Sequence, residues 1–163
     1  MRSAVLRMTR LNPPRSTEQR KADILAKFTT KPGTENDVWV ASASASGSAY
    51  LIPLSFYWDG STLTVATVKS SQTARNLTRA GRARMAIGPT RDVVILEGTL
   101  EIILEADVDD KLGSSFASAT GFDPRQSDPE YVYIRMKLQK VQAWREENEL
   151  AGRDIMKDGE WLA

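Results

Sequence analysis

Hydroxyl and cationic side chains are concentrated in a short stretch, KSSQTAR, that begins at Lys69. Ser71 precedes residues that favour a helix, and serine is a preferred N-cap, so a helix is expected to begin here. The first amides of a helix lack partners within it, and its dipole is positive at this end, so the two together attract anions. Lys69 and Arg75 could add charge-assisted hydrogen bonds. Hydroxyl donors are also at hand, from Ser70, Ser71 and Thr73. The pattern indicates a site for one phosphate group.

A purely structural interpretation of the same stretch is open as well. In that interpretation Ser71 only caps the helix, and Lys69 and Arg75 are solvated cations on the surface.

The composition excludes several other kinds of site. The 163 residues include no cysteine and no histidine. Disulfides, thiol catalysis, Ser-His-Asp triads, zinc–thiolate sites and His-ligated haem are therefore not expected. Asp107, Asp109 and Asp110 could suggest a metal, but acids in the first turn of a helix are explained by the helix dipole and by solvation. We assign no metal site.

Charge gives little reason to expect a polymeric or membrane partner. The formal net charge is +1, so no field of the whole molecule draws it to nucleic acid or to an anionic membrane. Arg75, Arg79, Arg82 and Arg84 form one basic cluster, which could bind a nucleic-acid backbone. Aromatic residues do not interleave with these arginines, which favours a phosphate-bearing cofactor or a long anionic cofactor tail instead. No apolar run is long enough to span a bilayer, and the N-terminus lacks a signal-peptide core, so a cytoplasmic protein is expected.

The elements that must position the phosphate site are predicted to be strands. The stretches YLIPLSFYW and STLTVATV are rich in strand-forming residues, and Asp59-Gly60 between them predicts a two-residue hairpin turn. The second strand leads directly into the helix that Ser71 begins and Gly81 ends. Further strands are predicted over 37–43, 82–87, 93–104 with a bulge at Gly98, and 131–144, with helices over 16–28 and 106–120 and a small hairpin near Asp158.

Six or seven strands joined mostly by short turns favour an antiparallel barrel over a βαβ sheet. The predicted fold class is therefore mainly β with a few helices. The length suits a single domain. Pro13-Pro14 excludes a helix near the N-terminus, so we expect a flexible arm over 1–15 and one domain over 16–163.

Three stretches, taken in order, resemble the pyridoxamine 5′-phosphate oxidase-like split-barrel family, whose members bind flavins and deazaflavins. They are DVWVASASASGSAYLIPLSFYWDG, STLTVATVKSSQTARNL and RARMAIGPTRDVVILEGTLEI. The resemblance extends over about residues 37–144. It implies a six-stranded split β-barrel, a homodimer with cofactor at the subunit interface, and either FMN or the deazaflavin coenzyme as cofactor.

Matching the family's motif positions also implies which residues contact that cofactor. Trp144 is implied to lie over the partner's cofactor, although an ordinary tryptophan at a strand end would explain it equally well. No catalytic residue is identified. The other implied contacts are Ile52, Pro53, Leu54 and Ser55 along the isoalloxazine ring, Val65, Ala66 and Thr67 beside it, and Lys69, Ser70, Ser71, Thr73 and Arg75 around the ribityl phosphate.

The resemblance also limits the activity. Members that oxidise vitamin B6 use an Arg-x-His element, which a chain without histidine lacks, so vitamin B6 oxidation is not expected. Many members also carry Arg-Lys where this chain has Gln72-Thr73, which implies that one phosphate contact is missing and that either Lys69 and Arg75 compensate or the affinity is poor. The implied function is a flavin- or deazaflavin-dependent oxidoreductase that transfers hydride between the bound cofactor and a small-molecule substrate. The alternative is a non-catalytic flavin-binding or carrier protein.

Overall fold

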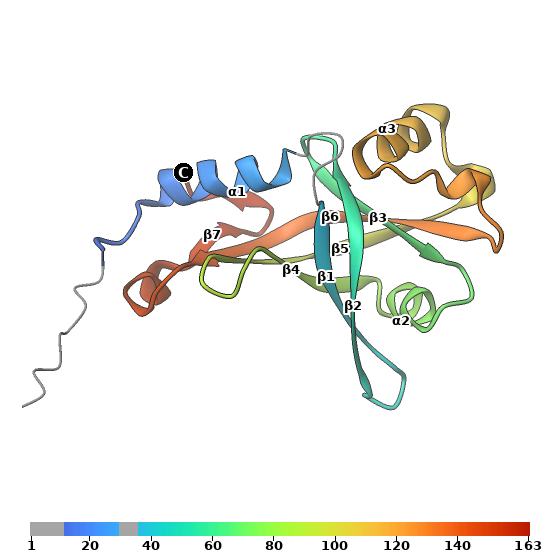
Figure 1. The fold of residues 1–163 in the computed structure, drawn as a ribbon. Helices are drawn as coiled ribbons and strands as arrows, with labels where there is room; N and C mark the ends of the chain where they lie inside the picture. Colours follow the sequence, from blue (N-terminus) through green and yellow to red (C-terminus); the bar gives the residue numbers. More distant parts are fainter. Residues whose placement is uncertain (1–11, 30–35) are drawn as a thin grey trace, which may run out of the picture.

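Six antiparallel strands close into a barrel in the computed structural model, which describes residues 12–29 and 36–163 (Figure 1). They run in the order β3-β2-β1-β4-β5-β6, and β6 pairs back onto β3 to close the barrel. The mainly β fold and the six-stranded split barrel predicted from the sequence are confirmed. The strands are β1 (Asp37–Ala43), β2 (Ala49–Trp58), β3 (Thr62–Val68), β4 (Arg82–Ile87), β5 (Val93–Leu104) and β6 (Tyr131–Trp144). Two short strands, β7 (Asp154–Lys157) and β8 (Glu160–Trp161), extend the sheet beyond β6.

The barrel is split between β2 and β3. These neighbours pair at three positions only, from Phe56 opposite Val65 to Trp58 opposite Leu63. The rest of β2 pairs with β1, and β3 pairs along its whole length with β6. The two strands therefore diverge from Ser55 and Ala66 onward and leave a gap in the barrel wall.

Three α-helices cover the barrel. α1 (Thr17–Phe28) begins with a capping box between Ser16 and Gln19. α2 (Gln72–Ala80) follows β3 directly and ends at Gly81, whose left-handed backbone has a φ of 63°. α3 (Asp110–Thr120) lies above β2 and β3 in Figure 1. Short 3-10 turns also occur: η1 (Glu105–Asp107) follows β5, η2 (Pro124–Gln126) follows α3, and η3 (Glu147–Gly152) follows β6. No helix in the described part of the chain is long and apolar enough to cross a membrane.

The core follows from the alternation of side chains along each strand. Val38 and Val40 of β1 are buried, whereas Trp39 between them is exposed. The inward residues of the other strands and the buried faces of α1 and α2 complete one main hydrophobic cluster. A smaller cluster of Ala66, Phe116 and Tyr133 lies between α3 and the outside of the barrel.

The local predictions agree with this structure except at two places. Three residues, 59–61, separate β2 from β3, rather than the two predicted. The Asp59 carboxylate takes part in the turn, because it accepts hydrogen bonds from the amides of Ser61 (2.8 Å) and Thr62 (2.7 Å). The helix predicted over 106–120 begins only at Asp110, because the Asp109 side chain caps the amide of Leu112. The bulge at Gly98 and the final hairpin are confirmed.

The predicted arm lies mostly outside the described residues, which begin at residue 12. Arg15, its last residue, is bound to Glu149 by hydrogen bonds from its amide, Nε and Nη2. The division into an arm and one domain stays a prediction.

Candidate functional site

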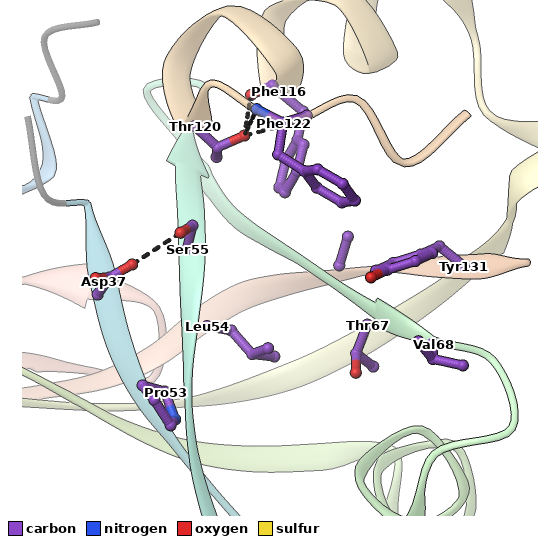
Figure 2. Close-up of a pocket in the computed structure, with 11 residues that line it drawn as sticks. Asp37, Pro53, Leu54, Ser55, Thr67, Val68, Phe116, Thr120, Phe122 and Tyr131 are labelled. Carbon is purple, nitrogen blue, oxygen red and sulfur yellow. Dashed lines mark hydrogen bonds between the residues drawn. The ribbon is translucent and has the colours of Figure 1, made fainter. Parts of the chain in front are cut away.

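The gap between β2 and β3 contains a cavity of about 370 Å³ (Figure 2). Three structural units form its walls: the diverging part of β2, the end of β3, and the C-terminal half of α3 with the loop after it. The lining residues are Asp37, Pro53, Leu54, Ser55, Ala66, Thr67, Val68, Phe116, Thr120, Phe122 and Tyr131. Most of these side chains are apolar or carry only a hydroxyl, and Asp37 is the one charged residue among them. Such a cavity suits a flat, largely apolar ring.

Five of the seven residues predicted to contact the ring line this cavity. They are Pro53, Leu54, Ser55, Ala66 and Thr67. The other two, Ile52 and Val65, are not among the lining residues. Val65 has no exposed surface and belongs to the main core, and Ile52 pairs with Val40 of β1.

The helix α2 begins next to the cavity. The hydroxyl of Thr67, which lines the cavity, is 3.4 Å from the hydroxyl of Ser71, the N-cap. Ser71 accepts a hydrogen bond from the amide of Ala74 (3.0 Å). The amides of Gln72 and Thr73 make no hydrogen bond with any described residue. Because free amides at a helix N-terminus attract anions, the phosphate site predicted from the sequence has backbone donors available.

The two predicted cations are engaged by groups of the protein itself. Lys69 Nζ contacts both carboxylate oxygens of Glu130, at 3.0 and 2.9 Å. This pair is about half exposed, 47% and 48% for the two side chains, and ion pairs of this kind contribute about 0–1 kcal/mol. Arg75 donates to the Ser70 carbonyl and to Gln72 Oε1. Both cations are therefore held in exposed contacts beside the start of α2.

Thr73 differs from the other predicted phosphate ligands. Its side chain is buried, with 1% of its surface exposed, and it faces the barrel rather than the start of the helix. The Thr73 amide makes no hydrogen bond with any described residue, but the Thr73 side chain is not exposed at the surface of the helix. Ser70 lies in the turn before the N-cap, where its carbonyl accepts from Arg75.

The sequence itself decides the family. Residues 26–145 match the family model described as pyridoxamine 5′-phosphate oxidase. The chain belongs to the pyridoxamine 5′-phosphate oxidase family. The match includes all six barrel strands, so it spans all three walls of the cavity and the whole of α2.

Solved structures share the fold of this family member. An F420 reductase superposes with a TM-score of 0.54 at 16% identity, over 70% of this chain and 92% of that one. A putative pyridoxamine 5′-phosphate oxidase from Listeria innocua gives a TM-score of 0.59 at 14% identity, over 77% and 98% of the two chains. A haem-binding protein from Mycobacterium smegmatis gives 0.63 at 18% identity, over 91% and 60%. At these identities the likeness shows the fold alone. Among curated proteins, no sequence matches this chain.

Trp144 is far from the cavity of its own chain. It ends β6, whereas Tyr131, which lines the cavity, begins the same strand. Trp144 pairs with Val93, and the guanidinium of Arg153 is 5.9 Å from the centre of its ring. A contact between Trp144 and cofactor would need the cavity of a second chain, and that role stays a prediction.

Six lining residues were not predicted from the sequence as site residues: Asp37, Val68, Phe116, Thr120, Phe122 and Tyr131. Phe116 lies within the helix predicted over 106–120, but nothing local indicates which side of the barrel this helix covers. Asp37 and Tyr131 begin strands whose register with β2 and β3 brings them to the gap. Asp37 accepts a hydrogen bond of 2.8 Å from the Ser55 hydroxyl (Figure 2).

The structure separates Arg75 from the other three arginines of the predicted basic cluster. Arg79, Arg82 and Arg84 line a separate groove of about 410 Å³ on the outer surface, with Ala41, Leu77 and Ala83 among its apolar residues. Arg84 is paired with Glu97 at 2.6 Å, and Arg79 donates to the carbonyl of Ala43. Arg75 is not part of this groove and belongs to the N-terminal turn of α2. No group of three or more acidic side chains comes together as a metal site among the described residues.

Proposed function

We propose that the gap between β2 and β3 holds the ring of a flavin-type cofactor, FMN or the deazaflavin coenzyme, and that the start of α2 holds its phosphate. The observation that carries the proposal is the adjacency of two features. The largely apolar cavity reaches Thr67, and Thr67 contacts the N-cap of a helix whose next two amides are free. A ligand that joins a flat ring to a phosphate fits both at once. Membership of the family supports the same ligand class.

The proposed contacts follow from the positions of the side chains. Pro53, Leu54 and Ala66 supply apolar contacts to the ring, and the hydroxyls of Ser55 and Thr67 lie at its edges. Ile52 and Val65 belong to β2 and β3 but do not line the cavity. Around the phosphate, the proposed ligands are the amides of Gln72 and Thr73, the side chains of Ser70 and Ser71, and the cations of Lys69 and Arg75.

We further propose an oxidoreductase that transfers hydride between the bound cofactor and a small molecule. A flavin or deazaflavin supplies the redox chemistry when bound, so the chain need only orient it and exclude water. The apolar walls of the cavity suit these two tasks. A chain without cysteine or histidine cannot use a thiol or an imidazole in catalysis.

A homodimer is the proposed assembly, and one apolar face of the barrel supports it. Strand register places Pro53, Trp39, Ala86 and Ile95 side by side across four strands, on the outside of the sheet. Trp39 is 48% exposed and the neighbouring Leu51 is 60% exposed. Contiguous apolar surface of this kind marks contact sites. The cytoplasm is the location we propose, as expected from the sequence.

The phosphate site is tested by removing its two cations together. Replacing Lys69 and Arg75 with alanine should leave the fold intact and weaken FMN binding by about 2–4 kcal/mol, since each charged hydrogen bond contributes about 1.5–3 kcal/mol. Fluorescence titration measures the affinity, and circular dichroism checks the fold. Arg91→Ala is the control, because Arg91 is 82% exposed and, among the residues that the structure describes, pairs only with Glu146. An unchanged affinity in the double variant would contradict the assignment.

The non-catalytic alternative requires the same site and differs in turnover. Reduced cofactor that is oxidised in the steady state by an added acceptor supports the oxidoreductase. Tight binding without turnover for any acceptor supports a carrier. Parallel titrations with FMN and with the deazaflavin coenzyme then decide which cofactor the site prefers.

A further inference from the structure

The helix α3 forms one wall of the cavity between β2 and β3. A second cavity lies on the other side of the same helix. Phe116 and Thr120 face the cavity between β2 and β3 (Figure 2). A second cavity of about 500 Å³ lies against the opposite side of the helix, between Ser114, Ser115 and Ser118 of α3 and the pair Tyr57 and Trp58 of β2. A helix with a cavity on each side is packed less tightly than one embedded in the core.

Few polar contacts hold α3 to the barrel. Within the described residues, no residue of β1 to β6 shares a hydrogen bond with α3. Asn36, immediately before β1, donates to the Ala119 carbonyl at 2.8 Å. The helix α2 is anchored differently, because Asn76 donates to the Ser42 hydroxyl of β1 at 3.1 Å and Arg79 donates to the Ala43 carbonyl.

A buried hydroxyl without a partner lies beneath α3. The ring of Tyr133 meets Phe116 edge to face, with 5.4 Å between ring centres, and Tyr133 has no exposed surface. Its hydroxyl makes no hydrogen bond with any described group. Burial raises the pKa of Tyr133 to about 12, with Asp123 and Glu105 raising it further and Arg125 opposing them, so the hydroxyl keeps its proton. Leaving such a donor unsatisfied is unfavourable, which favours any state that lets water reach it.

The helix α3 has capped ends, which allows it to move as a unit without unfolding. Its ends are capped by Asp109, which accepts from the Leu112 amide, and by Gly121 in a left-handed conformation. Arg125 of η2 connects the two elements: it contacts the Ser114 hydroxyl at 3.5 Å and lies so close to Gly113 that a Cβ there would be 2.6 Å from its Nη1. The helix and the turn therefore form one unit.

We propose that α3 and η2, residues 110–126, move together as a lid over the cavity between β2 and β3. Opening widens the cavity and exposes the Tyr133 hydroxyl to water, and closing places Phe116 and Thr120 back against whatever the cavity holds. The identity of that ligand rests on the proposed function, whereas the motion does not.

The absence of cysteine allows the motion to be followed by single thiols. Leu112→Cys places a thiol on the buried face of α3, where Leu112 is 7% exposed and lines neither cavity, and Ala74→Cys places one on the buried face of α2, where Ala74 is 3% exposed. Without cofactor and under native conditions, we expect a disulfide reagent to modify Cys at 112 about 100-fold faster or more than Cys at 74, since only α3 opens without global unfolding. Equal rates at the two positions would overturn the proposal.

A second substitution separates opening from static access. Tyr133→Phe removes the unsatisfied hydroxyl, so it should stabilise the closed lid and slow modification at position 112 by about tenfold, without changing position 74. A rate at 112 that stays the same or rises would contradict a lid biased by this hydroxyl. Saturating FMN should slow modification at 112 as well. Failure of FMN to bind would count against the proposed function, while the two comparisons without cofactor would still decide the lid.

Discussion

Glu149 is a buried carboxylate that joins two segments far apart in the sequence, around Arg15 and around Arg145. Its side chain is 4% exposed and accepts hydrogen bonds from the Nε and Nη2 of Arg15 at 3.0 and 2.8 Å. The backbone amides of Arg15 and Arg145 add two more, at 2.9 and 2.8 Å. The Arg15 side chain is the largest cause that lowers the pKa of Glu149, to about 2, and partial burial opposes it. This carboxylate connects the chain before α1 to the end of β6.

We expect Glu149→Gln to destabilise the protein in a pH-dependent way. The pKa of this group falls from an ordinary value of 4.5 to about 2 on folding, so its stabilisation is complete above about pH 4.5 and is lost as the pH falls towards 2. The variant should be less stable by about 1–3 kcal/mol at pH 7, through loss of charge-assisted hydrogen bonds, and the difference should shrink below pH 4.5. Urea denaturation at a series of pH values measures it.

Glu146→Gln is the control for this experiment, because Glu146 is 43% exposed and pairs with the exposed Arg91 at 3.3 Å. It should change stability by less than about 0.5 kcal/mol at either pH. A stability difference for Glu149→Gln that is as large at pH 2.5 as at pH 7 would show that the carboxylate charge is not what stabilises this junction.

Residue types predicted a phosphate site from the sequence, but not the contacts that Lys69 and Arg75 make in the folded chain. Ser71 as N-cap and Gly81 as the end of α2 follow from local rules and are confirmed. The partner of Lys69 is Glu130, which is 61 positions away and reaches it only because β3 and β6 close the barrel. Thr73 was expected among the ligands because a hydroxyl in a first turn is a common donor, and only the packing of α2 shows that its side chain is buried.

At the scale of elements, the bulge in β5 has a steric cause. A Cβ on Gly98 would lie 2.2 Å from the Lys137 carbonyl oxygen and 2.7 Å from Met136 Cγ, both in β6. The register between β5 and β6 shifts between Glu97 and Gly98. The two longest strands of the barrel therefore approach each other at a point where only glycine fits.

Gly98→Ala should accordingly be among the most damaging small substitutions in the barrel. We expect a loss of about 3 kcal/mol or more, because backbone rather than a flexible side chain blocks the new methyl group. Gly81→Ala is the matched control, since nothing lies within 4 Å of a Cβ there and only its φ of 63° disfavours alanine, which costs about 1 kcal/mol. Chemical denaturation of both variants measures the difference. Equal losses would mean that the strands separate easily at Gly98.

The strands and helices were largely predictable because each one carries a local pattern, whereas their mutual placement was not. Strand 82–87 and the final hairpin follow from alternation and turn residues alone. The start of α3 was placed too early because three acidic residues, Asp107, Asp109 and Asp110, suggested one helical turn, and only Asp109 proves to be the cap. That α3 covers the gap beside β3 depends on contacts such as Phe116 against Tyr133, which are absent from any local pattern.

At the scale of the whole molecule, the proposed dimer connects the apolar outer face to the cavity. Pro53 lines the cavity and also belongs to the row that it forms with Trp39 and Ala86 across the sheet. A second barrel packed on this face would therefore lie next to the cavity. The net charge of +1 leaves little long-range repulsion between two copies.

Trp39→Glu tests whether this face joins two subunits. We expect the natural chain to sediment as a dimer and the variant as a monomer, because a carboxylate placed at the centre of an apolar contact cannot be buried without a partner. Leu162→Glu is the control: Leu162 is similarly exposed, at 50%, but lies beyond β8 at the end of the chain, so this variant should remain dimeric. Affinity for FMN should fall in Trp39→Glu and not in Leu162→Glu, since the proposed cofactor site lies beside the interface. A monomeric natural chain, or a dimer that persists in Trp39→Glu, would contradict an interface on this face of the barrel.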